Sequence, residues 1–245
     1  MRELRAVILC AGQGRRLFPL TRNLPKSLLM IGNRPILEYI IDNVKESGIE
    51  PIHIVTGFRK ELIENFVREK GYSNVHFVHN EKYATTNTAS SLKLAIEEMN
   101  SDFVLINGDV FFDCRILEDL LAHPERNCVV VDNAINLDGE EVKVVADRSG
   151  RRIVRISKEL DPRICLGEAI GINKISTEYR EALLKVFDEL EQRGEYFHFF
   201  ENGIDRLVLK NCKFGIQLTD KPWVEIDTLS DLLYAKNEIY RKLFI

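Results

Sequence analysis

The chain has 245 residues, 45% hydrophobic and 29% charged, a composition typical of a soluble globular protein with ample core for one large domain. A formal net charge of −4 argues against a nucleic-acid binder, which usually carries a basic excess. Five cysteines without C-x-x-C spacing argue against a zinc or dithiol site and predict reduced thiols in a cytoplasmic protein. The apolar run at the N-terminus is too short for a signal peptide or a membrane span, so no membrane insertion is expected.

The first half of the chain alternates between strand and helix patterns. Continuous apolar runs predict buried strands, and apolar residues three and four apart predict amphipathic helices. The expected elements are strands at 5–10, 51–57, 74–80 and 102–112 and helices at 35–47, 59–71 and 88–99. Gly71 is expected to end the second helix, and Thr88 to be the N-cap of the third. Such alternation predicts an α/β fold with a parallel sheet.

The second half has a different pattern. Several short strands are expected within 127–157 and 165–172, with turns at "LDGEE" and "DRSGRR". Helices at 176–193 and 197–209, a strand near 213–218 and a terminal helix complete the chain. Because no linker or repeat separates the halves, we predict a single domain over 1–245 whose second half extends the sheet.

A glycine turn follows the first strand, where open parallel sheets bind ligands. Gly12 and Gly14 allow backbone N–H groups to approach an anion closely. The dinucleotide fingerprint requires a third glycine where Leu17 stands, and a P-loop requires glycine where Pro25 precedes Lys26. The turn is therefore neither of these two loops, and a purely structural turn is the alternative to an anion site.

Three cations accompany the turn. Arg15 and Arg16 are adjacent, so at least one faces the open side of the loop, and Pro25 restricts the approach to Lys26. Three positive charges beside a glycine turn suit a polyphosphate, especially one that leaves as pyrophosphate. Solvated surface charge is the alternative for each of them.

The stretch "LCAGQGRRLFPLTRNLPKSLLMIGNRPIL" resembles the signature of the nucleotidyltransferases that join a nucleoside triphosphate to a phosphorylated sugar or alcohol. Ala11 replaces the first glycine of that signature, and further matches occur at "NGD" and "EID". The resemblance implies a Rossmann-like fold of the nucleotide-diphospho-sugar transferase type, with a mostly parallel central sheet flanked by helices. It also implies a nucleotide-binding half at 1–122 and an acceptor-binding half at 123–245.

The resemblance implies site residues as well. Arg16 and Lys26 would be the catalytic cations on the β- and γ-phosphates, and Asp109 and Asp227 would hold the catalytic Mg²⁺, whereas Asp113 and Glu225 match less well. The implied nucleotide-binding residues are Cys10, Ala11, Gly12, Gly14, Arg16, Lys26, Asn80, Asn87, Thr88, Gly108 and Asp109.

The implied reaction is attack by a phosphate oxygen of the acceptor on the α-phosphorus, with loss of pyrophosphate. A phosphomonoester has its second pKa near ~6 and is largely dianionic at neutral pH, so no general base is needed. No nucleophile–histidine pair stands out in the sequence. His76 and His79 face opposite sides of a strand and are expected to be structural.

The predicted base is cytosine. The sequence lacks the Gln-Pro and Gly-Leu-Ala segments of sugar nucleotide synthases and is similar to the cytidylyltransferase branch at Asn80, Tyr83, Asn87 and Ser91. The resemblance therefore favours CTP over UTP or dTTP. A sugar-1-phosphate nucleotidylyltransferase and a non-catalytic nucleotide sensor are the alternative functions.

The acceptor is expected to be a small phosphoalcohol. By resemblance, Lys158 would meet its phosphate, and Glu168 and Glu201 its organic part. Phosphocholine needs an aromatic cage, which looks thin because Trp223 stands beside the metal motif, so inositol 1-phosphate is placed slightly ahead. A downstream enzyme that uses the CDP-alcohol is a possible partner, and nucleic acid is not.

Overall fold

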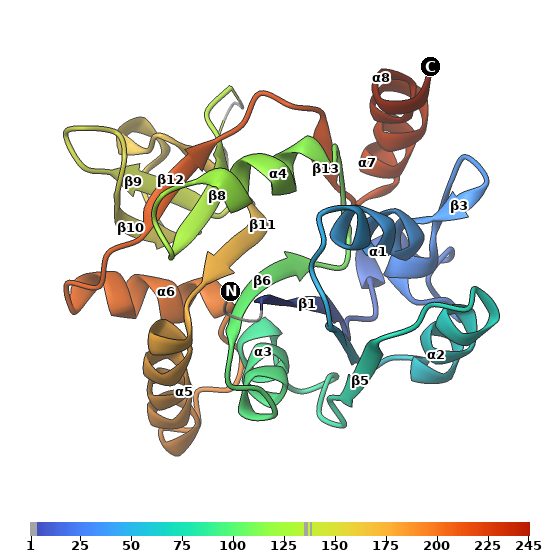
Figure 1. The fold of residues 1–245 in the computed structure, drawn as a ribbon, viewed down its shortest axis with the longest axis horizontal. Coiled ribbons are helices and arrows are strands. Elements are labelled where there is room, and N and C mark those ends of the chain that lie inside the picture. Colours follow the sequence, from blue (N-terminus) through green and yellow to red (C-terminus); the bar gives the residue numbers. More distant parts are fainter. Residues whose placement is uncertain (1–3, 135–136, 138) are drawn as a thin grey trace.

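The computed structural model describes residues 4–134, 137 and 139–245 (Figure 1). Within them, strands from both halves form one nine-stranded sheet, in the order β10-β9-β11-β6-β1-β4-β5, with β8 pairing with β11 and β12 with β8. Its strands are β1 (Leu4–Cys10), β4 (Ile52–Thr56), β5 (Val75–His79), β6 (Asp102–Asn107), β8 (Cys128–Asp132), β9 (Lys143–Ala146), β10 (Ile153–Ser157), β11 (Gly167–Ile175) and β12 (Gly215–Leu218).

The centre of the sheet is parallel, as the sequence predicts. β1 pairs in parallel with β4 and β6, and β4 with β5, whereas β11 runs antiparallel to β6. The remaining short strands are β2 (Met30–Ile31), β3 (Arg34–Pro35), β7 (Val110–Phe112) and β13 (Trp223–Glu225). The expected α/β fold with a mostly parallel central sheet is therefore confirmed.

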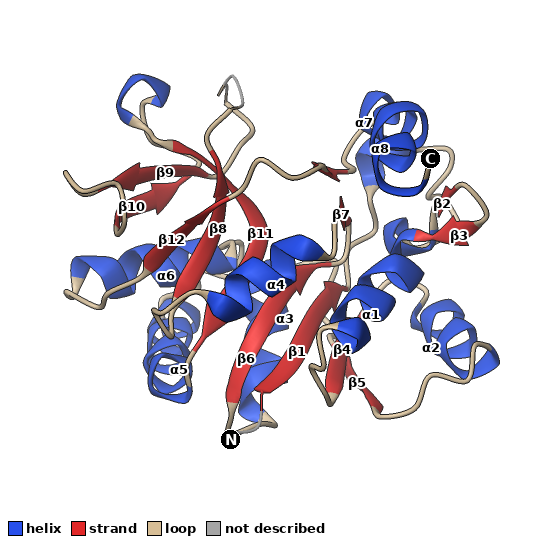
Figure 2. Cartoon of the chain, turned by 45° about the horizontal axis from the view of Figure 1, so that its top comes forward, coloured by secondary structure: helices blue, strands red, loops and turns tan. Residues whose placement is uncertain are grey.

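Helices cover both faces of the sheet. They are α1 (Ile36–Glu46), α2 (Lys60–Glu69), α3 (Thr88–Glu97), α4 (Arg115–Ala122), α5 (Thr177–Gln192), α6 (Phe200–Leu209), α7 (Leu229–Tyr234) and α8 (Tyr240–Phe244), with a π-helical turn at Ala235–Ile239. Figure 2 shows α1 and α4 in front of β1 and β6 and α3 behind them. None of the helices in the described part of the chain is long and apolar enough to cross a membrane.

Alternation along β1 divides the core into two layers. Ala6, Ile8 and Cys10 pack into the cluster that contains α1, α2 and α4, and Val7 and Leu9 pack into the cluster that contains α3, α5 and α6. The five residues Ala6–Cys10 are all buried because helices cover both sides of the sheet, which explains the unbroken apolar run in the sequence. All five cysteines are free thiols.

Two local predictions are wrong. The N-cap of α3 is Asn87, whose Oδ1 accepts a hydrogen bond from the N–H of Thr88, so Thr88 is the first helical residue. The fourth predicted strand ends at Asn107, because the chain turns at Gly108 and continues as β7 in a separate ribbon with β13. The predicted turn at "LDGEE" includes position 138, which lies outside the described residues.

Candidate active site

A hollow of about 360 Å³ lies beyond the carboxyl ends of β1 and β6. Side chains from both halves of the chain line it, as expected for an open parallel sheet. The sequence-predicted residues in its lining are Cys10, Ala11, Gly12, Gly14, Arg16, Lys26, Asn87, Thr88, Gly108, Asp109, Lys158, Glu201 and Asp227. Asn80 and Glu168 are not part of this lining.

The glycine turn brings Lys26 to the floor of the hollow. Gly14 has φ +64°, and a Cβ there would lie 3.1 Å from Cβ of Lys26. The hydroxyl of Thr21 donates a 2.6 Å hydrogen bond to the carbonyl of Gly14 and fixes this close approach. A Cβ at Gly12 would meet no atom within 4 Å, so the space beside that residue is open to a ligand.

Gly108 lets the chain cross the end of β1. A Cβ at this position would lie 2.4 Å from Sγ of Cys10 and 2.6 Å from the carbonyl oxygen of Leu9. Only glycine fits such a contact, and the crossing delivers Asp109 to the hollow.

The ribbon of β7 and β13 brings two distant acidic motifs together. Glu225 pairs with Val110, and the N–H of Ile226 donates a 3.0 Å hydrogen bond to the carbonyl of Asp109. As a result, carboxylate oxygens of Asp109, Glu225 and Asp227 lie within 4.8 Å of one another.

These carboxylates fit a divalent cation. Oδ1 of Asp109 is buried and has no hydrogen-bond partner among the described residues. Magnesium prefers one or two carboxylates together with waters and substrate phosphates, and Asp109 and Asp227 match that preference. Burial and the charges of Asp109 and Asp227 raise the pKa of Glu225 well above its ordinary value, so extra positive charge at this point would be stabilising.

Cationic side chains neutralise the acidic cluster. Nζ of Lys26 lies 2.5 Å from Oδ2 of Asp109 and 2.7 Å from Oδ1 of Asp227. Nη2 of Arg16 lies 2.6 Å from Oδ2 of Asp227, and its Nη1 lies 3.1 Å from Glu140. Burial alone would lower the pKa of Lys26, but the two aspartates outweigh it and raise that pKa. Burial alone would raise the pKa of Asp227, but Lys26 and Arg16 lower it.

The loop after β13 fixes the position of Asp227. Oδ2 of Asp231 accepts hydrogen bonds of 3.0 Å from the N–H of Asp227 and 2.7 Å from the N–H of Thr228. The side chain of Thr228 accepts one in return from the N–H of Asp231, which completes a capping box on α7. Asp227 is therefore held in place through its backbone, so that its carboxylate can bind the cationic side chains.

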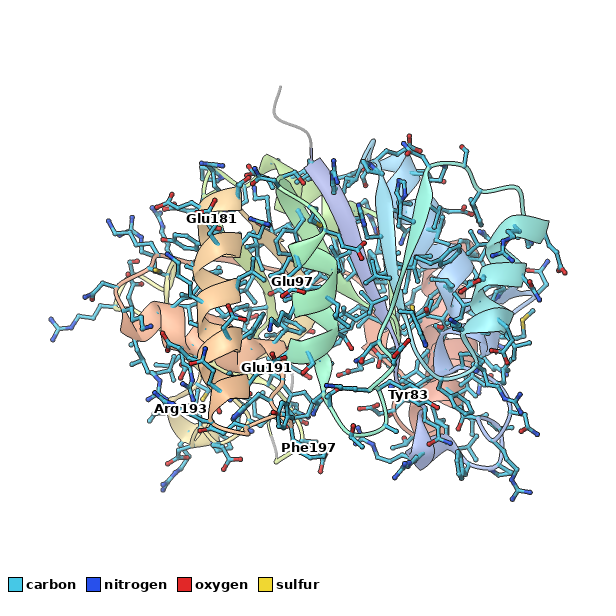
Figure 3. All side chains as sticks on the ribbon, turned by 90° about the horizontal axis from the view of Figure 1, so that it is seen from below. Tyr83, Glu97, Glu181, Glu191, Arg193 and Phe197 are labelled. Carbon is cyan, nitrogen blue, oxygen red and sulfur yellow. The ribbon has the colours of Figure 1, made fainter. Side chains whose placement is uncertain are left out.

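The start of α3 forms another wall of the hollow. Figure 3 shows Tyr83 on one side and Phe197 on the other side of the N-terminal end of this helix. The N–H of Asn87 donates to the carbonyl of Tyr196 at 3.2 Å, and Lys93 joins α3 to Glu191 of α5 at 2.6 Å. The wall therefore depends on α5 and the residues that follow it, which come far later in the chain.

Asn80 organises this wall from behind. Its Nδ2 donates to Thr86 at 3.2 Å and to Ser91 at 3.0 Å, and its Oδ1 accepts from the N–H of Lys82 at 2.9 Å. The side chain is buried, and both its nitrogen and its oxygen make hydrogen bonds within the protein. Asn80 thus positions the loop that carries Tyr83 and stands outside the lining itself.

The opposite wall comes from the second half of the chain. Nζ of Lys158 lies 4.7 Å from the centre of the Phe199 ring, and Glu201 lies next to it at the start of α6. Burial raises the pKa of Glu201 to about 7. Asp205 accepts hydrogen bonds of 2.9 Å from Nε of Arg155 and from the N–H of Ile156, which ties α6 to the strand that precedes Lys158.

A second hollow of about 660 Å³ adjoins the first, and the two share Arg16, Glu140, Glu225 and Asp227. Glu168 lies here, together with Trp223. Nε1 of Trp223 donates a 2.8 Å hydrogen bond to Asp132. The lining holds eight acidic and three basic side chains, so it favours a positively charged occupant.

The sequence did not predict a role in the site for three residues that lie in or near it, or indicated that role only weakly. Glu225 completes the carboxylate cluster, and its place in "EID" was the available signal. Trp223 faces the second hollow because β13 pairs with β7. Glu140 forms an ion pair with Arg16, and nothing in the local sequence marks it for that role.

Comparison with known proteins decides the family. The nucleotidyl transferase family model matches residues 5–135. The choline-phosphate cytidylyltransferase of Streptococcus pneumoniae is 38% identical over 248 residues, which cover 98% of this chain and 96% of that protein. The chain belongs to the nucleotidyl transferase family.

Two further proteins show how far the likeness extends. The bifunctional protein GlmU of Methanococcus aeolicus is 32% identical over 243 residues, and the chain spans only 55% of that relative. The inositol-1-phosphate CTP transferase of T. maritima superposes with a TM-score of 0.82 over 99% of this chain and 96% of its own, at 21% identity, which shows a shared fold. The family model covers the glycine turn and Asp109, whereas Lys158, Glu201 and Asp227 lie beyond it.

Proposed function

We propose that this nucleotidyl transferase family member moves CMP from CTP to the phosphate of a small alcohol, giving a CDP-alcohol and pyrophosphate. The observation that carries the proposal is the grouping of Lys26 and Arg16 with Asp109 and Asp227 beside the glycine turn. The full-length likeness to a choline-phosphate cytidylyltransferase supports the choice of a CDP-alcohol. Residues 1–122 form the nucleotide half in this proposal, and residues 123–245 form the acceptor half.

The chain's own residues have defined tasks in this reaction. Backbone N–H groups at Gly12 and Gly14 bind the triphosphate, and Lys26 and Arg16 transfer from the aspartates to its β- and γ-phosphates. Mg²⁺ held by Asp109 and Asp227 would supply positive charge to the α-phosphate and the leaving group. Lys158 orients the acceptor phosphate, one of whose oxygens forms the bond to the α-phosphorus while the bond to pyrophosphate breaks. Because the attacking oxygen is already ionised, the site needs no base.

Asn87 supports cytosine as the base. Its Oδ1 is used by the N–H of Thr88, and no acceptor is recorded for its Nδ2 group in the part of the chain that the structure describes. The side chain therefore offers a donor to the hollow. N3 of cytosine accepts a hydrogen bond, whereas N3–H of uracil or thymine donates one, so this donor discriminates in favour of CTP.

Replacing Asn87 by aspartate tests this assignment. Aspartate caps a helix as well as asparagine does, so α3 is expected to remain intact. The change replaces the donor by an acceptor, and we expect kcat/KM for CTP to fall about tenfold or more while that for UTP does not. The measurement is the steady-state rate with each nucleotide. Asn87→Ser is the control, because serine still caps the helix but has no amide group to donate to the base. An undiminished preference for CTP in Asn87→Asp would assign base selection to another residue.

Two acceptors compete, and the second hollow supports phosphocholine. A quaternary ammonium favours aromatic faces and carboxylates, and Trp223 and Glu168 line one acidic space next to Asp227. This support, together with the 38% identical relative, reverses the order that the sequence favoured. Inositol 1-phosphate has no cation to place in that space.

The deciding experiment measures pyrophosphate release from CTP with phosphocholine, inositol 1-phosphate and glucose 1-phosphate, at saturating CTP and Mg²⁺. We expect kcat/KM for phosphocholine to exceed that for inositol 1-phosphate at least about tenfold, since a buried cation–π contact with carboxylates is worth ~1–2 kcal/mol. Trp223→Leu should remove most of this preference. Inositol 1-phosphate as the better acceptor would restore the sequence-based choice, and glucose 1-phosphate would overturn the cytidylyltransferase assignment.

A further inference from the structure

One buried carboxyl group faces the first hollow without a partner. Glu201 is only 5% exposed, and its Oε2 has no hydrogen-bond partner among the described residues. The residue stands in the first turn of α6, a helix of 10 residues, and it lines the same hollow as Lys158 and Asp109. A buried polar atom without a partner, on a residue that lines a cavity, is a place where a water or a ligand atom can complete the hydrogen bonding.

The position of Glu201 is fixed on two sides. The N–H of Phe200 donates a 3.0 Å hydrogen bond to the hydroxyl of Thr88, which joins the start of α6 to the start of α3. The bonds from Arg155 and Ile156 to Asp205 join the same helix to β10. These contacts therefore hold the first turn of α6, and with it the backbone of Glu201, beside the hollow.

The charges around Glu201 indicate which ligand atom it meets. Lys158, which follows β10, favours its ionised form, and Asp109, which follows β6, opposes that form. Two cations on the neighbouring elements are engaged elsewhere, because Arg155 pairs with Asp205, and Lys93 of α3 pairs with Asp188 and Glu191 of α5. In the proposed reaction the acceptor phosphate lies between Lys158 and the metal carboxylates, which is the space that Glu201 faces.

An ionised carboxylate at this point would repel a phosphate dianion, whereas a carboxylic acid is a hydrogen-bond donor to it. Resting on the proposed transfer reaction, we propose that Glu201 binds the phosphate of the acceptor by donating a hydrogen bond from its protonated carboxyl group. This differs from the role that the family resemblance implied, in which Glu201 faces the organic part of the acceptor.

The inference gives the acceptor step a defined pH profile. The acceptor phosphate must be dianionic to attack, which requires a pH above its second pKa of about 6. Glu201 must keep its proton, and burial raises its pKa to about 7. We therefore expect kcat/KM for the acceptor to fall about tenfold for each pH unit above 7, as one essential proton is lost.

The test compares wild type with Glu201→Gln, in which a neutral amide supplies a similar donor that does not titrate. With phosphocholine as the varied acceptor and saturating CTP and Mg²⁺ from pH 5.5 to 9, the variant should retain activity within about threefold at pH 6.5 and lose the alkaline decline. The ratio of the two profiles cancels the titration of phosphocholine. Glu201→Ala should be slower at every pH, and Glu189→Gln, an exposed carboxyl change on α5, should match wild type.

A second measurement needs no acceptor. Because the folded protein keeps the Glu201 proton after the unfolded chain has lost its own, wild-type stability should decline relative to Glu201→Gln as the pH rises from 5 to 7. Urea unfolding midpoints of the two proteins report this difference. A difference that stays constant with pH, or an alkaline decline that persists in Glu201→Gln, overturns the inference while the transfer reaction stands. Absence of any CDP-alcohol from wild type overturns the proposed function and this inference together.

Discussion

Replacing Asp109 or Asp227 by asparagine is expected to cut kcat for nucleotidyl transfer by about 10³-fold or more, the scale set by losing metal-assisted charge stabilisation. Both carboxylates belong to the cluster of Asp109, Glu225 and Asp227, whose oxygens lie within 4.8 Å of one another. Asparagine keeps the shape but removes the negative charge that a magnesium ion requires. The measurement is single-turnover transfer from CTP, with and without Mg²⁺ after chelation.

The fold should survive these substitutions. Asp227 is positioned through its backbone by Asp231, and in Asp109→Asn the ammonium of Lys26 keeps Asp227 as its partner. Asp147→Asn, in an exposed turn outside both hollows, is the matched control and should retain full activity. Titration with Mn²⁺ gives a readout independent of activity, since each site variant should bind the ion more weakly than wild type in the presence of CTP. Full activity in either variant would remove both aspartates from the metal site.

The second large effect is expected at Lys26. Lys26→Ala should lower kcat/KM about 10²-fold or more, comparable with the loss of one donor that stabilises the transition state. The reason is that this ammonium lies between Asp109 and Asp227, beside the glycine turn, and in the proposed reaction it stabilises the leaving pyrophosphate. Steady-state rates with CTP and phosphocholine provide the measurement, and Lys60→Ala on the exposed surface of α2 is the control.

Lys26 also neutralises the aspartates in the free protein, and this second role can be measured separately. In Lys26→Met the two carboxylates lose their shared cation, so the melting temperature should fall, and Mg²⁺ alone should raise it more than in wild type. A loss of activity below twofold in Lys26→Ala, with no change in the response to Mg²⁺, would place this lysine outside the chemistry.

Most of the fold could be predicted from local patterns. The apolar runs of β1, β4 and β5 and the helical spacing of α1 and α2 were predicted close to their observed bounds, and the start of β6 was predicted as well. These predictions succeed because a strand that is buried on both faces, or a helix that is buried on one face, requires apolar residues at fixed spacings within a short stretch of sequence. The errors at Thr88 and Gly108 arose where a side-chain cap or a steric contact with another strand decided the boundary.

The site was predicted in part. The residues from the glycine motif and the two aspartates were predicted for different reasons. The glycine turn, Arg16 and Lys26 lie within one short stretch, so a single motif indicated them together. Asp109 and Asp227 were paired only through resemblance, since nothing local relates two motifs that far apart. Trp223 was placed beside the metal motif, but its exposure to the hollow that holds Glu168 depends on the pairing of β13 with β7, which the local sequence does not indicate.

By itself the sequence determined the α/β fold and a glycine turn with cationic neighbours after the first strand, because glycine conformation, apolar periodicity and charge are local properties. The tertiary structure decided the rest: which carboxylates share Lys26, why Asn80 supports the wall and does not line it, and why Glu201 is buried beside the hollow with an oxygen that no described residue binds. The physical reason is that electrostatics and burial depend on distance in space. That distance is set by the β7–β13 ribbon and by the bonds from Asp205 to β10, which join segments far apart in the chain.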